Sequence, residues 1–79
     1  MIELTNEIIL KIDNLLFDFD ILALEVGRTA HNEENIPKAC VNDDIFIEYY
    51  NGIKNGNKSS QMRDICLPKY IRRELSKNN

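Results

Sequence analysis

The chain has 79 residues, of which 43% are hydrophobic and 29% charged, with a net charge of −3 at neutral pH. This composition is that of a globular domain and excludes an intrinsically disordered chain, while the length allows one domain with a small core. Three glycines, two prolines and no tryptophan disfavour a turn-rich β-sandwich.

Residues 5–28 carry the strongest pattern in the sequence. Apolar side chains recur there at alternating spacings of four and three, and we call them the first seam: Ile8, Ile12, Leu15, Phe19, Leu22 and Val26. This spacing predicts an amphipathic helix over about 5–30, with the hydroxyl of Thr5 as its N-cap. The alternation from Phe17 to Ile21 suits a strand instead, but it lasts only five residues.

The same helix would carry a second stripe, Leu10, Phe17 and Leu24, separated from the first seam by Asp13 and Asp20. A helix with two apolar faces has to be covered twice, and the remaining chain has apolar surface enough for one of them. We therefore expect the second stripe to meet another polypeptide, most simply a second copy, which predicts a homo-oligomer. The alternative is that a later helix of the same chain covers it.

Residues 31–41 have the composition of a connector, and a second helix is predicted over about 43–54. Asn42 is a strong N-cap residue, and Asp43 and Asp44 suit the first turn. The apolar face of this helix is Phe46, Tyr49, Tyr50 and Ile53. Residues 45–47 also have the β-branched and aromatic character of a strand.

Asn55, Gly56 and Asn57 predict a turn, and two short helices are expected over about 60–77. Pro68 should separate them, because a residue before proline is driven out of helical geometry. The whole chain, 1–79, is thus predicted to form one all-α domain of three or four helices, led by the long one.

No residue pattern indicates catalysis or metal binding. His31, Glu33, Glu34 and Cys40 lie within ten residues but lack the spacing of zinc or iron ligands. His31 and Cys40 could act as base and nucleophile, yet no third group is placed to orient them. We expect a protein that is not an enzyme and uses no cofactor.

Cys40 and Cys66 are 26 positions apart, and no segment has the pattern of a secretory signal or an apolar run long enough to span a membrane. A cytoplasmic protein with two buried, reduced thiols is expected.

Charge is distributed unevenly along the chain. Residues 1–53 have eleven acidic and three basic side chains, whereas residues 54–79 have two acidic and seven basic ones. Either the basic segment packs across the acidic one, or it binds nucleic acid through Lys69, Arg72, Arg73 and Lys77. In outline, a short helix, a break at Pro68 and a basic helix resemble a helix-turn-helix motif.

The segment Asp43-Asp44-Ile45-Phe46-Ile47-Glu48-Tyr49-Tyr50 resembles the acidic segment, ending in two tyrosines, by which colicin-type nuclease immunity proteins hold their toxins. The resemblance covers eight residues and lacks the proline that follows in that family, and nothing else in the chain agrees with it. The chain is therefore not assigned to that family.

Without catalytic groups, two amphipathic faces and a charge dipole favour a protein that works by binding another protein, as a regulator or inhibitor. Eleven isoleucines, ten asparagines and six lysines have A/T-rich codons, which suggests an AT-rich genome such as that of a phage, plasmid or low-GC bacterium. The partner would then be a host protein. Predicted contacts are the second stripe (Leu10, Phe17 and Leu24) with Tyr49 and Tyr50, and Asp18 and Asp20 as polar rim. The alternative is a transcriptional regulator that binds nucleic acid through its basic C-terminal helix.

Overall fold

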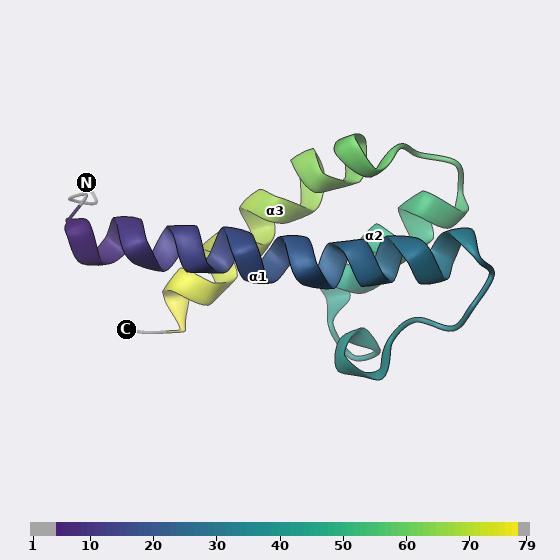
Figure 1. Ribbon diagram of the computed structural model, residues 1–79, viewed down its shortest axis with the longest axis horizontal. Helices are drawn as coiled ribbons and strands as arrows, with labels where there is room; N and C mark the ends of the chain where they lie inside the picture. The colour runs from purple at the N-terminus through teal and green to yellow at the C-terminus, as the bar shows by residue number, and fades with distance from the viewer. Residues whose placement is uncertain (1–4, 78–79) are drawn as a thin grey trace.

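The computed structural model describes residues 5–77, which form three α-helices and one short 3₁₀ helix (Figure 1). The α-helices are α1 (Asn6–His31), α2 (Asp44–Lys54) and α3 (Ser59–Ser76), and the 3₁₀ helix η1 is Lys38–Cys40. No strand occurs within 5–77, so the small all-α bundle is confirmed and both strand alternatives are wrong. Across the same residues, no helix is both long and apolar enough to span a membrane.

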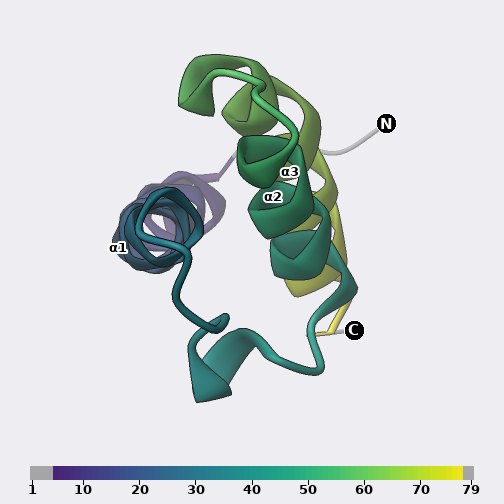
Figure 2. The same cartoon turned by 90° about the vertical axis from the view of Figure 1, so that its right-hand side faces the viewer.

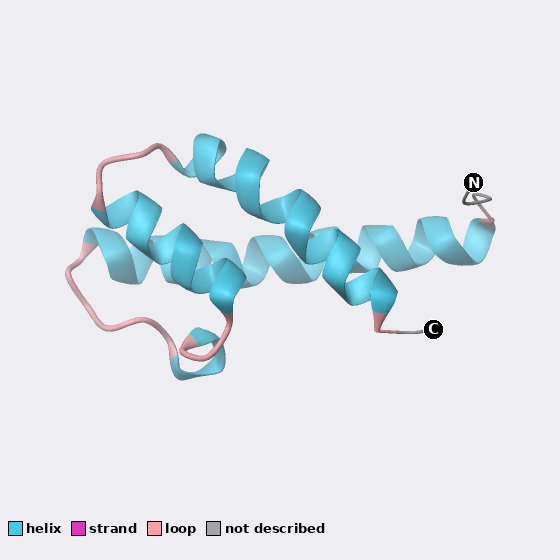
Figure 3. Ribbon diagram, turned by 180° about the vertical axis from the view of Figure 1, so that it is seen from behind, coloured by secondary structure: helices cyan, strands magenta, loops and turns pink. Residues whose placement is uncertain are grey.

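α1 sets the size of the molecule. Its 26 residues extend about 39 Å at 1.5 Å per residue, close to the longest dimension of 42 Å. α2 and α3 stand together on one side of α1 (Figure 2), and the first turns of α1 extend past the C-terminal end of α3 (Figure 3). The bundle is thus two layers deep, with α1 alone in one of them.

The helix ends follow the capping residues. The Thr5 hydroxyl accepts a hydrogen bond from the Ile8 amide at 3.2 Å, as expected for an N-cap. In α2 the cap is Asp43 rather than the predicted Asn42, because the Asp43 carboxylate accepts from the Ile45 amide at 3.0 Å. Gly56, with φ of +95°, makes the predicted turn after α2, a backbone conformation that glycine adopts without a steric penalty.

The two short C-terminal helices predicted over 60–77 are in fact one helix, α3, with Pro68 in its interior. Pro68 is exposed, so the carbonyl group deprived of its amide partner lies on the side that faces water. Met62 and Cys66 before the proline and Tyr70 after it are all buried in the core. Their burial holds both halves of α3 on the bundle and offsets the cost of the proline. Because α3 is continuous, the helix-turn-helix outline suggested by the sequence is absent.

The core is organised around Phe19, which is fully buried. Its ring lies 5.4 Å from that of Phe46 and 6.2 Å from that of Tyr49, both on α2, and 5.5 Å from that of Tyr70 on α3. Aromatic rings at these separations contribute about 0.5–1.5 kcal/mol per pair beyond their burial. Phe19 therefore joins all three helices, and the first seam from Leu15 to Val26 is the part of α1 that packs inward.

The two phenylalanines of α1 give a direct test of this packing. Replacing Phe19→Ala should lower the free energy of unfolding by about 3–5 kcal/mol, because it leaves a cavity between three helices. Replacing Phe17→Ala, on the opposite side, should change it by less than about 0.5 kcal/mol. Urea unfolding followed by circular dichroism measures both, and equal losses would contradict the packing described.

Candidate protein-binding face

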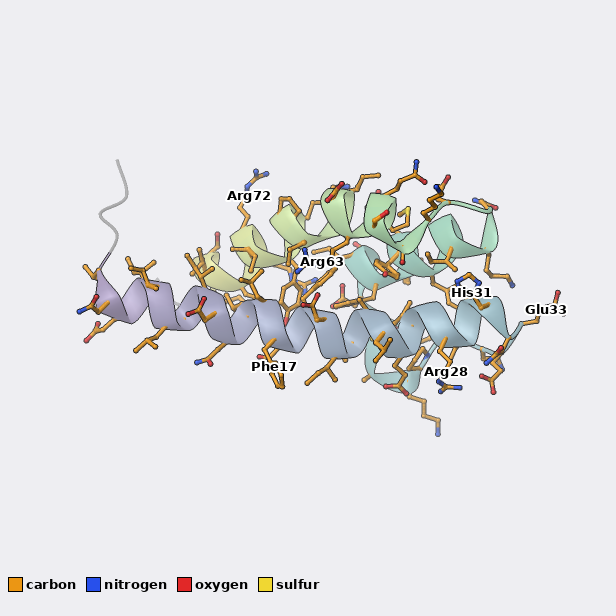
Figure 4. All side chains as sticks on the ribbon, turned by 45° about the horizontal axis from the view of Figure 1, so that its top comes forward. Phe17, Arg28, His31, Glu33, Arg63 and Arg72 are labelled. Carbon is orange, nitrogen blue, oxygen red and sulfur yellow. The ribbon has the colours of Figure 1, made fainter. Side chains whose placement is uncertain are left out.

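The second stripe lies on the outside of the bundle. Leu10 is 64% exposed, Phe17 67% and Leu24 77%, and Ile21 on the same side is 52% exposed. We call these four residues the outer face. Figure 4 shows Phe17 pointing away from α2 and α3. The alternative in which a later helix covers the second stripe is wrong, because α2 and α3 both pack on the first seam.

Sequence reasoning missed Ile21 as part of this face. It lies four residues after Phe17 and three before Leu24, the spacing that places side chains on one side of a helix. This spacing is visible in the sequence, but the alternation of residues 17–21 also fits a strand, in which Ile21 would have another environment.

Acidic side chains border the outer face on both sides. Asp13 and Asp20 lie along one edge, and Asp18 and Glu25 along the other. Asp20 forms a bidentate ion pair with Arg63 of α3, at 3.0 and 3.3 Å, so it ties two helices together. Asp13, Asp18 and Glu25 are exposed and form no ion pair with any residue from 5 to 77.

A cleft of about 510 Å³ adjoins the outer face at Leu24, between α1 and the first turns of α3. Ala23, Gly27 and Tyr49 form its apolar lining together with Leu24. Its polar lining comes from Asp20, Arg28, His31, Ser59 and Arg63. An apolar surface with a charged rim thus continues from the outer face into a concave site.

Gly27 keeps part of this cleft open. A glycine inside a helix costs about 0.8–1 kcal/mol relative to alanine. A Cβ atom placed there would meet only Tyr49, at an ordinary 3.7 Å from its Cε1 atom. Packing within the chain therefore does not demand a glycine at this position, and the space beside it is available to a bound side chain.

The two predicted tyrosine contacts have structural roles. Tyr49 is buried against Phe19 and reaches the surface only as part of the cleft wall, so it is not an exposed contact residue. The Tyr50 hydroxyl donates a hydrogen bond to the Glu34 carbonyl, which fastens the connector to α2. The acidic segment 43–50 accordingly forms the N-cap and first turns of α2, with Phe46 and Tyr49 buried in the core and Tyr50 half-buried.

Three of the four basic residues considered for nucleic-acid binding are engaged in ion pairs. Lys69 bonds Glu48 at 2.8 Å, Lys77 bonds Glu74 at 3.0 Å, and Arg73 bonds Asp43 at 2.8 and 3.0 Å. Arg72 points away from the bundle (Figure 4) and has no ion pair within the described chain. The basic segment thus packs across the acidic one, which was the first of the two sequence-based alternatives.

A second surface hollow, of about 500 Å³, lies beside Arg73 and Lys77, but Asp43 and Asp44 line it as well. Their carboxylates would repel a phosphate group at this position.

Both thiols are buried, as predicted, and neither is in a disulfide. Burial raises the pKa of Cys66 to about 11, and the nearby Glu48 carboxylate acts in the same direction. Burial, with the charges of Asp43 and Glu25, also raises the pKa of Cys40. His31 is exposed and makes no hydrogen bond to Cys40. A raised pKa opposes formation of the thiolate that a nucleophile requires.

Within residues 5–77, no three His, Cys, Asp or Glu side chains come together in a way that could hold a metal ion. A scan against protein-family models found no match, and searches of curated proteins and of solved structures found no significant similarity.

The ion pair between Asp43 and Arg73 yields a prediction about pH. Burial alone would raise the pKa of Asp43, but hydrogen bonds from Arg73 and the charge of that guanidinium hold it below its ordinary value of 3.8, with help from the amides of Ile45 and Phe46. A carboxyl group with a lowered pKa stabilises the fold above its unfolded pKa, and this stabilisation is lost as the pH falls through the folded value.

Replacing Asp43→Asn should therefore cost about 1–2 kcal/mol of unfolding free energy at pH 7, and the difference from wild type should be smaller at a pH below the ordinary value of 3.8. Asp44→Asn is the matched control, because Asp44 is exposed and has no arginine partner. Urea unfolding at both pH values provides the measurement. A cost that does not vary with pH, or one equal to that of Asp44→Asn, would be inconsistent with the ion pair.

Proposed function

We propose that this protein is a non-enzymatic binding protein that acts by attaching its outer face to another polypeptide. The observation that supports this most strongly is the exposure of Leu10, Phe17, Ile21 and Leu24 on one side of one helix. Monomeric soluble proteins seldom expose a contiguous apolar patch of this kind without using it for an interaction. The adjoining cleft offers the concave site in which an anchoring side chain can be buried.

The mode of action that fits such a face is regulation or inhibition by occupancy. An amphipathic helix that docks into a groove covers surface on its partner and needs no chemistry of its own. Together with an A/T-rich coding bias, this supports a role in which a product of a phage or mobile element binds a host protein.

Nucleic-acid binding through α3 is the weaker alternative. Lys69, Arg73 and Lys77 each have a carboxylate partner within the chain, and binding a phosphate would require those ion pairs to break. Arg72 alone is a small electrostatic footprint for a nucleic-acid-binding protein.

Capture from a cell extract of the source organism or its host tests the proposal. The immobilised protein should retain at least one protein that Phe17→Ser loses by about tenfold or more, since an aromatic at the centre of an interface is worth about 1.4 kcal/mol or more. Quantitative mass spectrometry of the retained proteins is the measurement.

Ile65→Ser is the matched control for this capture. Ile65 is 46% exposed and lies on α3, outside the outer face, so its replacement should leave capture unchanged. If every retained protein survives Phe17→Ser, or depends equally on Ile65, the outer face is not the binding surface.

A further inference from the structure

The outer face belongs to a longer heptad pattern. On the exposed side of α1, residues at successive spacings of four, three, four, three and four are Leu10, Asn14, Phe17, Ile21, Leu24 and Arg28. Alternating spacings of four and three identify the helix surfaces that pair with another helix in a coiled coil. α1 therefore has two such surfaces, and its own chain uses only the first seam.

From the charges beside this pattern we infer that the partner is a helix of a different protein, with lysine or arginine flanking its own apolar seam. The inference rests on the proposed function and names the class of partner. The flanking positions, which face the partner's flanks in a helix pair, are Asp13 and Asp20 on one side and Lys11, Asp18 and Glu25 on the other. Because Arg63 already pairs with Asp20, the unpaired charges at these positions are three acids and one base, which leave this surface net negative.

A second copy fits these flanks poorly in a parallel arrangement. In a parallel pair, each flanking residue of one edge meets the residue five positions on in the other helix. Asp13 would then face Asp18 of the second copy, and Asp20 would face Glu25 of the second copy. Asp13 and Asp18 are both unpaired, so their contact sets two free carboxylates together, and like charges facing across an interface oppose association. The pair of Asp20 with Arg63 weakens the repulsion at Asp20 and Glu25 but does not make that contact attractive.

An antiparallel self-pair fits no better. Centred on the heptad pattern, it sets Asp18 against Asp18 of the second copy and Asp20 against Asp20 of the second copy. Lys11 could meet Glu25 at both ends of the pair, which offsets this repulsion, but in each copy Asn14 would lie against a leucine of the other. A buried amide without a hydrogen-bond partner costs about 1–3 kcal/mol. For this reason we propose a different protein as the partner of the outer face, rather than the second copy expected from the sequence.

The apolar part of the pattern is short. Leu10 and Leu24 are roughly 21 Å apart along the helix, at 1.5 Å per residue. An apolar contact of this length gives limited affinity alone, so the flanking charges should decide which helix binds. Binding should then weaken as salt rises, because exposed charges are screened.

Two synthetic helical peptides test this inference. Both contain leucine and isoleucine in a heptad seam on an alanine-rich helix. One carries lysine at every flanking position and the other carries glutamate. In fluorescence anisotropy at low salt, the lysine peptide should bind at least about tenfold more tightly than the glutamate peptide, and lose that advantage near 1 M salt, where charges are screened beyond about 3 Å.

Exchanging the charges on α1 supplies the control. In the triple variant Asp13→Lys, Asp18→Lys and Glu25→Lys, all three changed side chains are exposed and lack ion pairs within the described chain, so the fold should persist. The preference should reverse, with the glutamate peptide now binding more tightly. Phe17→Ser should weaken both peptides, whereas Ile65→Ser should weaken neither.

The outcomes separate this inference from the proposed function. Equal binding of the two peptides, or binding of neither, would overturn the inference that the partner is a helix flanked by basic residues. A dimer found by light scattering at micromolar concentration and dissociated by Phe17→Ser would show that the occupant is a second copy. In each of these cases a Phe17-dependent protein captured from extract would still uphold the proposed function, which fails only if no such protein is captured.

Discussion

The burial of Phe19 fixes the orientation of α1. Its ring lies among aromatic rings from both other helices, and no rotation of α1 about its axis could preserve those contacts. Because successive residues of a helix are about 100° apart, Phe17 lies about 200° away from Phe19. The contact that forms the core therefore also turns Phe17 and its apolar neighbours out toward water.

The length of α1 enlarges the apolar surface that remains exposed to water. A helix of 26 residues packs against helices of 11 and 18 residues that lie in a single layer (Figure 2). Two helices on one side of a third cover one face of it, and the short η1 leaves the outer face more than half exposed. The exposed apolar surface is thus a result of architecture rather than of one misplaced side chain.

Ion pairs distinguish two sets among the acidic residues of the protein. Asp20, Asp43 and Glu48 hold α3 against the rest of the bundle through Arg63, Arg73 and Lys69. Asp13, Asp18 and Glu25 have no such partners in the described residues and border the outer face. The first set of acids therefore stabilises the fold by pairing with the basic C-terminal segment. The second set remains available to influence which partner binds.

Much of this could be predicted from the sequence because local patterns dictated it. The seam spacing, the Thr5 cap and the Gly56 turn gave α1, α2 and the all-α fold. The continuity of α3 through Pro68 could not be predicted, because it depends on tertiary contacts that bury Met62 and Tyr70 on either side of the proline. The burial of Tyr49 likewise depends on which face of α2 meets Phe19, and periodicity does not rank the two tyrosines.

The account depends on the outer face being in contact with water in the free protein. Solution NMR with a soluble gadolinium chelate measures this directly, through the paramagnetic relaxation of individual methyl groups. At micromolar concentration the methyl groups of Leu10, Ile21 and Leu24 should relax strongly, while those of Val26 and Ile53, which are buried, should be protected. Protection of Leu10, Ile21 and Leu24 to the level of Val26 would mean that the face is already covered, and would contradict the account.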